Sequence, residues 1–421
     1  MMRFICGLSR GNALKELLPG KLLGYQDKDS PETKLIDFLE DVLIIILGEL
    51  DFYDYSTTFH NSDSDFIEKQ RYDGWYNNLG HPSWGSVETR LVRKTPASYA
   101  DGVYMMAGMD RPSPRYLSEL FMKGSDGMPS VANRTVMLAF FGQLVSSEIL
   151  QASEPGCPIE LHKIPIEKCD KIFDRECRGN KYMPFQRARY DYSTGQSPNN
   201  PREQLNYMTS WIDGSFVYST SEARLNMLRS FNNGTFRTDP DDTSMPPKNT
   251  ERIPMENNPI PHVLKFLNPE DMFMLGDLRV NQNPAILAFG ILFFRWHNIL
   301  AERIQNEHPY WGDEQIFQKA RRTLIAHLQN IIMYEFLPAF IGDSIPPYTQ
   351  FGHTLVPPGF YRRGKNCEFL KTNTGYEAIR LCSTWWDAND VMTNETIEYY
   401  LRGMSSQIAE KEDNVLCSDG L

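Results

Sequence analysis

The sequence has no block of basic residues, no internal repeat and no apolar run long enough to cross a membrane. A membrane helix needs about 20 apolar residues, whereas the longest apolar run, residues 42–47, has acidic residues on both sides. The net charge of −11 comes from dispersed Asp and Glu, which excludes nucleic acid as an expected partner. The composition predicts a soluble globular protein with 41% hydrophobic residues.

An ordinary signal peptide is also missing, because Met1 is not followed by a basic stretch and a longer apolar core. Two readings of residues 42–47 stay open: a piece of buried helix or strand, and a displaced signal-peptide core. Secretion has other support, since Asn133, Asn233 and Asn394 each begin an Asn-x-Ser/Thr sequon that permits glycosylation. Chance alone supplies some sequons in a chain of this length.

The seven cysteines show no CxxC or Cys/His spacing, which argues against a zinc site. They form two groups and two isolated residues near the ends: Cys157, Cys169 and Cys177; Cys367 and Cys382; Cys6 and Cys417. Grouping within loops favours local disulfides, with Cys367–Cys382 the pair expected first. The odd count leaves at least one thiol without a partner in this chain.

Three segments have the 3 and 4 residue spacing of amphipathic helices. One is predicted from about Arg134 to Ala152. A second starts at Asn283-Pro284, an N-cap followed by Pro at the first helical position. The third begins near Asp313 and is expected to stop at Pro338. Residues 60–130 and 180–265 have no sustained period and predict long ordered loops, so the fold class is mainly α with little strand.

Four short motifs occur in an order that is similar to that of a known protein family. Gly276-Asp277-Leu278-Arg279 is followed by Arg295-Trp296-His297-Asn298, by Tyr334-Glu335-Phe336-Leu337-Pro338 and by Phe351-Gly352-His353-Thr354. This set resembles the animal haem peroxidase superfamily. The resemblance implies a helical haem-peroxidase-like fold, haem as cofactor, His353 as the axial iron ligand and Arg279 as the cation that faces hydrogen peroxide. Two other readings remain, namely a structural role for His353 and an ion pair between Arg279 and Asp277 at a loop edge.

The helix that should carry the distal histidine departs from the family. Gln143 is retained, but Ser147 stands where the distal histidine belongs and Ser146 where a haem-linking aspartate belongs. The second ester-forming carboxylate is replaced by Gln282. A serine hydroxyl does not shuttle protons near neutral pH as an imidazole does. The sequence therefore predicts weak or lost peroxidase activity and no covalent attachment of haem through these positions.

A calcium loop, by contrast, is nearly complete. Thr209, Asp213, Ser215 and the Trp211 carbonyl resemble the family's calcium ligands, and Glu148 takes the place of the usual aspartate on the distal helix. Oxygen donors on an extended loop suit a hard cation. The longer Glu148 side chain leaves the identity of the cation open, and a Thr/Ser-rich turn without metal is the alternative.

This combination of losses and retained motifs resembles one branch of the superfamily, the peroxidase-like ectodomain of dual oxidases, over about residues 68–415. That branch forms hydrogen peroxide outside the cell from NADPH through FAD and membrane haems, all located C-terminal to the ectodomain. Contact with a membrane is expected only through those C-terminal helices, which this sequence does not contain. The resemblance implies an extracellular or luminal location and four kinds of partner: hydrogen peroxide, tyrosine substrates, a maturation factor and the rest of the oxidase.

The expected organisation is an atypical N-terminal segment, residues 1–60, and a peroxidase-homology domain, residues 61–421. That domain is expected to be shortened before Phe351, where the family has a further helix, and truncated at its C-terminus. Two functions follow. The first is a domain with weak peroxidase chemistry that supports peroxide production and tyrosine cross-linking. The alternative is a catalytically inert, haem-free scaffold for oxidase maturation.

Overall fold

The computed structural model describes residues 69–122, 129–130, 132–152, 156, 158–258, 266–342, 349–350, 353–354, 386 and 392–409. These residues are mostly helical, which confirms the predicted fold class. The chain divides into two compact units. Among the described residues, the first contains 69, 130–145 and 216–409, and the second contains 70–129 and 146–215. The run of residues 42–47 lies outside the described part.

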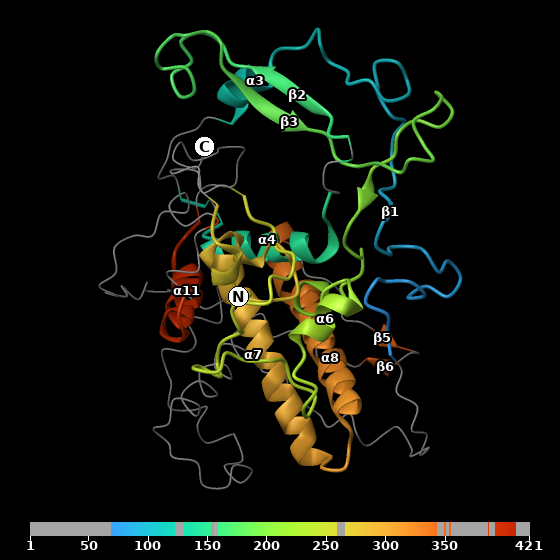
Figure 1. Ribbon diagram of the computed structural model, residues 1–421, viewed down its shortest axis with the longest axis vertical. Helices are drawn as coiled ribbons and strands as arrows, with labels where there is room; N and C mark the ends of the chain where they lie inside the picture. Colours follow the sequence, from blue (N-terminus) through green and yellow to red (C-terminus); the bar gives the residue numbers. More distant parts are fainter. Residues whose placement is uncertain are drawn as a thin grey trace. The chain divides into compact units, whose positions relative to one another are not determined.

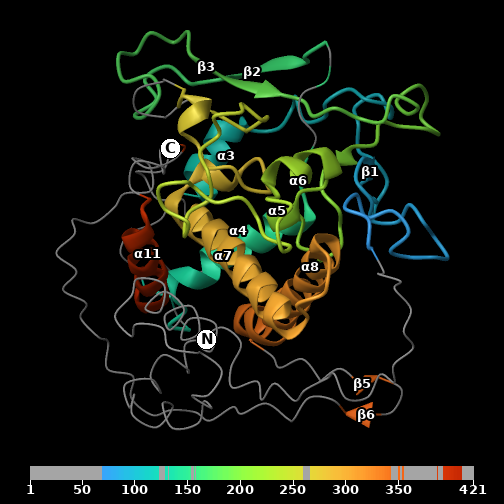
Figure 2. The ribbon, with the colours of Figure 1, turned by 60° about the horizontal axis from the view of Figure 1, so that its bottom comes forward.

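Two long helices, α7 (Pro284–Glu307) and α8 (Asp313–Asn330), form the centre of the first unit and lie side by side (Figures 1 and 2). Asn283 caps α7 as the sequence predicts, because its side-chain oxygen accepts hydrogen bonds from the Ala285 and Ile286 amides. Helix α11 (Asn394–Ser406) packs beside α7. The inward face of α7 is apolar, and Leu287, Phe289 and Ile291 are fully buried.

The helical path does not stop at Pro338, so that prediction was wrong. After α8 comes one stretch of π-helix, η5 (Ile331–Phe336), and then α9 (Leu337–Ile341). Pro338 is the second residue of α9 and comes directly after the π-helical stretch, and the chain passes it without leaving the helical path. The helix ends instead at Gly342, whose φ of 86° is left-handed.

Helix α4 (Val136–Ile149) matches the helix predicted from about Arg134 to Ala152. Its first part belongs to the first unit, where the Phe141 ring packs edge-on against Phe289 of α7 and contacts Phe336. The loops of the first unit also contain short elements. These are α5 (Ser215–Tyr218), α6 (Glu222–Leu228), η3 (Pro269–Asp271), η4 (Val280–Gln282), β5 (Thr349–Gln350) and β6 (His353–Thr354). The first residue of α5, Ser215, is assigned to the second unit.

The second unit consists largely of loops, as predicted, with α3, the last residues of α4 and two small sheets. Helix α3 spans Pro114–Phe121. Strand β1 (Thr89–Arg90) pairs antiparallel with β4 (Leu205–Asn206), and β2 (Leu161–Pro165) pairs antiparallel with β3 (Tyr182–Gln186). A disulfide joins Cys169 to Cys177 between β2 and β3, which confirms that the first cysteine group forms a local disulfide. Cys367 and Cys382 lie outside the described residues.

Two helical stretches are long and apolar enough to meet the length and composition criteria for a membrane span, contrary to the expectation from the sequence. They are Pro284–Glu307 and Asp313–Ile341. In the first, 89% of the apolar window is buried inside the protein. Burial of this kind is typical of the central helix of a globular core, so α7 carries its apolar residues for packing.

Candidate functional site

The loop Gly276–Arg279 of the first unit lies directly against the backbone of α5. The Asp277 amide donates to the Phe216 carbonyl at 2.9 Å. A Cβ added to Gly276 would lie 2.3 Å from the Val217 carbonyl oxygen, so only glycine permits this approach. Arg224 of α6 completes the support, because its Nε donates to the Gly276 carbonyl at 2.8 Å and its second terminal nitrogen donates to the Leu275 carbonyl at 2.8 Å.

Arg279, the predicted distal cation, forms an ion pair with Asp277. Its Nε is 3.0 Å from one carboxylate oxygen of Asp277 and a terminal nitrogen is 2.7 Å from the other. Burial favours the neutral guanidinium, but the Asp277 charge outweighs this effect and raises the pKa of Arg279. The structure thus contains the ion pair that the sequence left open as an alternative, and it keeps Arg279 charged.

Polar amides gather where η4 meets α4 in the first unit. The Gln143 side-chain nitrogen donates to the Gln282 side-chain oxygen at 2.8 Å, and the Asn283 side-chain nitrogen donates to the Gln143 side-chain oxygen at 3.3 Å. Gln282 is the residue that replaces an ester-forming carboxylate. Amides and a guanidinium can hydrogen-bond a polar ligand, but they offer neither a proton shuttle nor an ester link to haem. These residues therefore fit non-covalent haem binding and do not fit peroxide cleavage.

Ser147 lies one turn beyond Gln143 on α4 and is half-buried. No histidine occurs in α4 that could take its place. His353, the predicted proximal ligand, belongs to β6, whose backbone pairs with β5 so that His353 is opposite Gln350. The position of the His353 side chain lies outside what the structure describes, and so does the segment 343–348 where the family's helix is predicted to be shortened.

The predicted calcium loop closes around Glu148 within the second unit. One carboxylate oxygen of Glu148 accepts hydrogen bonds from three consecutive amides, those of Asp213, Gly214 and Ser215, at 3.0, 2.6 and 3.2 Å. The Ser215 hydroxyl donates to the Glu148 carbonyl at 2.8 Å and lies 3.3 Å from the second carboxylate oxygen. Glu148 is fully buried, and successive N–H groups that converge in this way form an anion-binding nest.

The remaining oxygens of this loop have spacings that suit a cation. The Thr209 hydroxyl lies 2.8 Å from an Asp213 carboxylate oxygen and 3.3 Å from the Trp211 carbonyl. Calcium binds oxygens at about 2.4 Å, so neighbouring ligands of one ion are separated by about 3 Å. Thr209, Asp213 and Ser215 are all buried. The donor set therefore fits a hard cation, with one Glu148 oxygen already used by the amide nest.

The motif Arg295–Asn298 holds α7 against the loop 230–245 by hydrogen bonds. The sequence did not reveal this role. Arg295 donates to the Ser244 carbonyl, and Asn298 accepts from the Phe236 amide at 2.7 Å. His297 lies between them with its Nε2 2.9 Å from the Gly234 carbonyl, which can only accept a hydrogen bond. Its Nδ1 consequently accepts from the Tyr218 hydroxyl at 2.9 Å, and His297 is a neutral structural residue.

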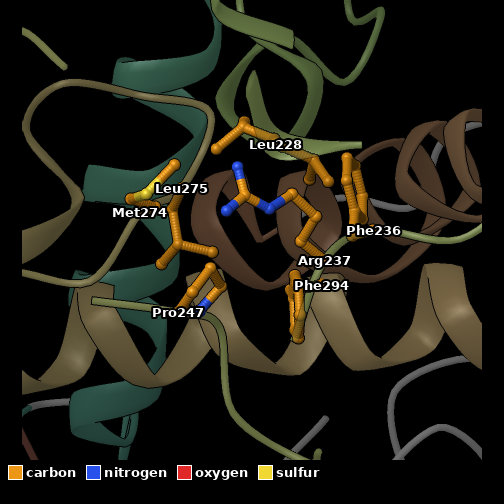
Figure 3. A pocket seen from close by; sticks show the side chains of 8 residues that line it. Leu228, Phe236, Arg237, Pro247, Met274, Leu275 and Phe294 are labelled. Atoms are coloured by element: carbon orange, nitrogen blue, oxygen red, sulfur yellow. The ribbon is translucent and has the colours of Figure 1, made fainter. Parts of the chain in front are cut away.

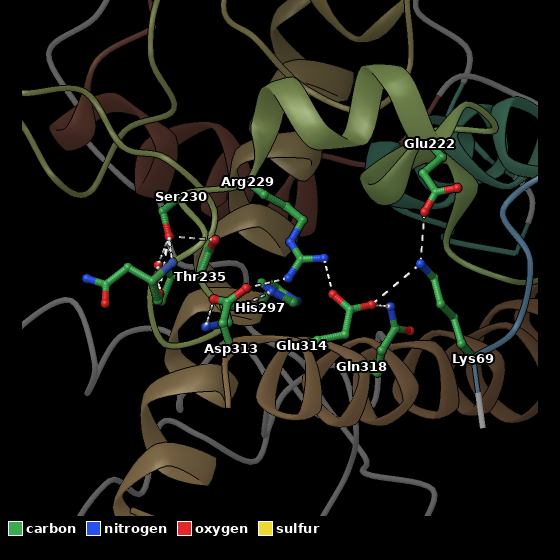
Figure 4. A network of polar contacts seen from close by, with 11 residues as sticks. Lys69, Glu222, Arg229, Ser230, Thr235, His297, Asp313, Glu314 and Gln318 are labelled. Atoms are coloured by element: carbon green, nitrogen blue, oxygen red, sulfur yellow. Dashed lines mark hydrogen bonds and ion pairs between the residues drawn. The ribbon is translucent and has the colours of Figure 1, made fainter. Parts of the chain in front are cut away.

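An ion-pair network surrounds this histidine (Figure 4). Arg229 is 4% exposed and binds Asp313 at 2.6 Å and Glu314 at 2.5 Å, both in the first turn of α8. Its guanidinium also lies 4.0 Å from the centre of the Phe317 ring. Glu314 continues the network to Lys69, and Lys69 binds Glu222 at 2.8 Å. Through these ion pairs, the network connects the end of α6 with the first turn of α8.

Stability should fall with acidification because of His297. Burial, reinforced by the charges of Arg229 and Arg321, lowers the pKa of His297 to about 3. The unfolded chain binds this proton near the ordinary value of 6.5, so the contribution is complete above that value and is lost progressively as pH falls toward 3. We expect melting temperatures to drop between about pH 7 and about pH 4.5, and His297→Gln to reduce that slope; His327, whose pKa burial lowers to about 4, accounts for part of the remaining slope. The exposed His81 is the control, since His81→Gln should leave the slope unchanged.

A small pocket exists elsewhere in the first unit. It offers only about 10 Å³ to a water-sized molecule and is lined mainly by apolar side chains with Arg237 among them (Figure 3). Binding sites for small molecules usually occupy about 300–1,000 Å³. None of the candidate site residues lines this pocket, so it is not the predicted haem site.

Two of the three sequons are readily accessible. Asn133 and Asn233 are exposed and both have left-handed backbone conformations, with φ of 52° and 51°. Asn394 is half-buried at the start of α11, and its side-chain oxygen accepts from the buried Arg295 at 2.9 Å. Asn394 therefore already serves as an internal hydrogen-bond partner in the folded protein.

Comparisons with known proteins show which family the chain belongs to. The chain is 61% identical over 371 residues to the dual oxidase of Drosophila melanogaster and 44% identical over 375 residues to dual oxidase 1 of Caenorhabditis elegans. Each match covers 84% of this chain, but only 24% and 25% of the relatives, so the chain spans about a quarter of their length. The fold resembles peroxidase A of Dictyostelium discoideum, with a TM-score of 0.61, 29% identity and coverage of 68% of this chain and 55% of that one. The profile of the animal haem peroxidase family matches residues 69–349 and 347–419, and the chain belongs to that family, with dual oxidases among its curated relatives.

Proposed function

We propose that this chain is the peroxidase-like domain of a dual oxidase that forms hydrogen peroxide, and that its own haem peroxidase activity is weak or lost. One observation carries the second part: Gln143 and Gln282 are bonded to each other, and Ser147 stands at the expected acid-base position. An enzyme that cleaves peroxide needs a proton shuttle there, and neither amides nor serine supply one at neutral pH. By family, the domain would lie on the extracellular side of the plasma membrane.

When bound, haem supplies the iron that breaks the O–O bond of peroxide. His353 would hold that iron, and Arg279 would place a fixed positive charge toward the peroxide. The ion pair with Asp277 fixes the direction of the Arg279 side chain. Tyrosine residues of extracellular proteins would be the substrates of any remaining activity, with cross-linking as the result.

The calcium loop would support this domain structurally. Glu148, Thr209, Trp211, Asp213 and Ser215 would hold calcium or another cation, and the fit of their oxygen spacing supports this assignment. FAD and NADPH would belong to other parts of a full-length dual oxidase. Glycans are proposed at Asn133 and Asn233, and also at Asn394 if it is modified before Arg295 binds it.

The alternative function is a haem-free scaffold that binds a maturation factor and the rest of the oxidase. A specific observation favours it: Arg279 is paired with Asp277, and Gln143 with Gln282, so the polar groups expected to face a haem ligand already bind one another. Pairs of this kind stabilise the fold without any cofactor.

A visible absorption spectrum of the purified protein, reconstituted with hemin and calcium, distinguishes the two functions. The haem-binding function predicts a stoichiometric Soret band that His353→Ala abolishes and that His81→Ala, at an exposed histidine, preserves. Ser147→His should then raise peroxidase turnover by about 100-fold, the usual gain from a positioned acid-base group. A folded protein without a Soret band would leave the scaffold as the function.

A further inference from the structure

Arg224, which is half-buried, links two loops of the first unit through its guanidinium. Besides the Leu275 and Gly276 carbonyls, it donates to the Pro254 carbonyl at 2.5 Å. Burial, opposed by the Asp277 charge, lowers the pKa of Arg224 to about 10. The group is still charged at neutral pH, and its hydrogen bonds hold the loop at Pro254 against the loop that carries Asp277 and Arg279.

The remaining partner of this guanidinium is a thioether. The second terminal nitrogen of Arg224 lies 3.0 Å from the Met255 sulfur. A thioether sulfur is a weak hydrogen-bond acceptor, so this contact is the weakest of the set. The neighbouring Glu256 amide donates to the Leu278 carbonyl at 3.2 Å, so Met255 stands where the two loops meet.

A second contact of the same kind in this unit provides a comparison. Arg295 lies 3.2 Å from the sulfur of Met245. Met245 is 5% exposed, whereas Met255 is only half-buried, so part of its side chain is open to solvent. The two sulfurs therefore share a guanidinium partner and differ in access.

We propose that Met255 is an oxidation site for hydrogen peroxide and that its sulfoxide strengthens the link from Arg224 to the loop Gly276–Arg279. The sulfur gives an electron pair to one peroxide oxygen and the O–O bond breaks; the departing hydroxide takes the proton from the oxygen now bound to sulfur and leaves as water. Thioether and hydrogen peroxide thus become sulfoxide and water. The product oxygen would be a strong acceptor within reach of the Arg224 guanidinium, with which it can form a charge-assisted hydrogen bond.

The inference rests on the proposed function only for the source of the peroxide. A domain that lies where an oxidase releases peroxide would be exposed to it continuously. The result would be a firmer position for Asp277 and Arg279, because Arg224 binds the carbonyls immediately before them.

The test uses the whole chain treated with dilute hydrogen peroxide, followed by peptide mass spectrometry and amide hydrogen exchange. We expect sulfoxide at Met255 and at Met109, which is 88% exposed, while Met245 stays reduced. Exchange of the Asp277 and Arg279 amides should slow by about fivefold, as one stronger hydrogen bond would produce. Met255→Leu keeps the side-chain volume and should abolish the slowing without changing the oxidation of Met109.

Two outcomes would overturn the proposal. If Met255 remains a thioether while Met109 is fully converted, Met255 is not an oxidation site. If Met255 is oxidised but amide exchange at Asp277 and Arg279 stays the same or becomes faster, the sulfoxide does not strengthen the contact with Arg224 and the proposal is wrong. Because peroxide is added directly, a failure here is independent of whether the protein shows a Soret band.

Discussion

Replacing Glu148 with alanine should lower the free energy of unfolding by about 4 kcal/mol, because three buried N–H groups would lose their common acceptor. The amides of Asp213, Gly214 and Ser215 all donate to one oxygen of this carboxylate. The substitution also removes the carboxylate that the Ser215 hydroxyl faces. Water has little access to these groups, since Glu148, Asp213 and Ser215 are buried.

Urea unfolding, monitored by circular dichroism in the presence of a chelator, measures this loss. Glu222→Ala is the matched control, because Glu222 pairs with Lys69 on the surface and its side chain is 60% exposed. A surface ion pair of this kind contributes less than about 1 kcal/mol. Equal effects of the two substitutions would mean that the amide nest contributes no stability.

Repeating the titration with calcium examines the cation proposal separately. A site filled at about 100 times its dissociation constant adds about 2.7 kcal/mol to the wild-type protein. Asp213→Asn should remove most of that increment, since it takes one charge from the donor set. If calcium leaves the wild-type curve unchanged, the loop is a metal-free turn, while the expected loss for Glu148→Ala still holds.

Local chemistry explains which parts of the fold were predictable. The start of α7 was visible because an N-cap and the following Pro act within a few residues of each other. The end of the α8 path was not, since Pro338 normally stops a helix and the π-helical stretch before it has no sequence signal. The boundary lies instead at Gly342, whose left-handed conformation ends the helix.

The candidate site was likewise predictable only in part. The loop 209–215 was recognisable from its resemblance to the family's calcium loop, and the structure brings Glu148 into contact with it. The amide nest that occupies one Glu148 oxygen could not be predicted, because it depends on the backbone path of Asp213–Ser215. The hydrogen-bond partners of Arg295 and His297 lie 51 and 63 residues away in the chain. The structural role of the motif Arg295–Asn298 is therefore visible only in the folded protein.

Gly276→Ala should destabilise the protein by at least about 3 kcal/mol or prevent soluble expression, because the added methyl group meets backbone that cannot move aside. Its Cβ would lie 2.3 Å from the Val217 carbonyl oxygen and 2.6 Å from the Phe216 carbonyl oxygen. The Phe216 carbonyl also accepts a hydrogen bond from the Asp277 amide. The shift needed to relieve the clash would therefore also move the Asp277–Arg279 ion pair.

Gly403→Ala supplies the control, since Gly403 lies inside α11 and an added Cβ there meets nothing within 4 Å. Alanine favours a helix over glycine by about 1 kcal/mol, so Gly403→Ala should raise the melting temperature slightly. Thermal unfolding of both variants compares the same chemical change in two environments. A Gly276→Ala protein as stable as the wild type would mean that the loop carrying Arg279 does not depend on close contact with α5. In that case the fixed position of Arg279 would have to come from Asp277 and Arg224 alone.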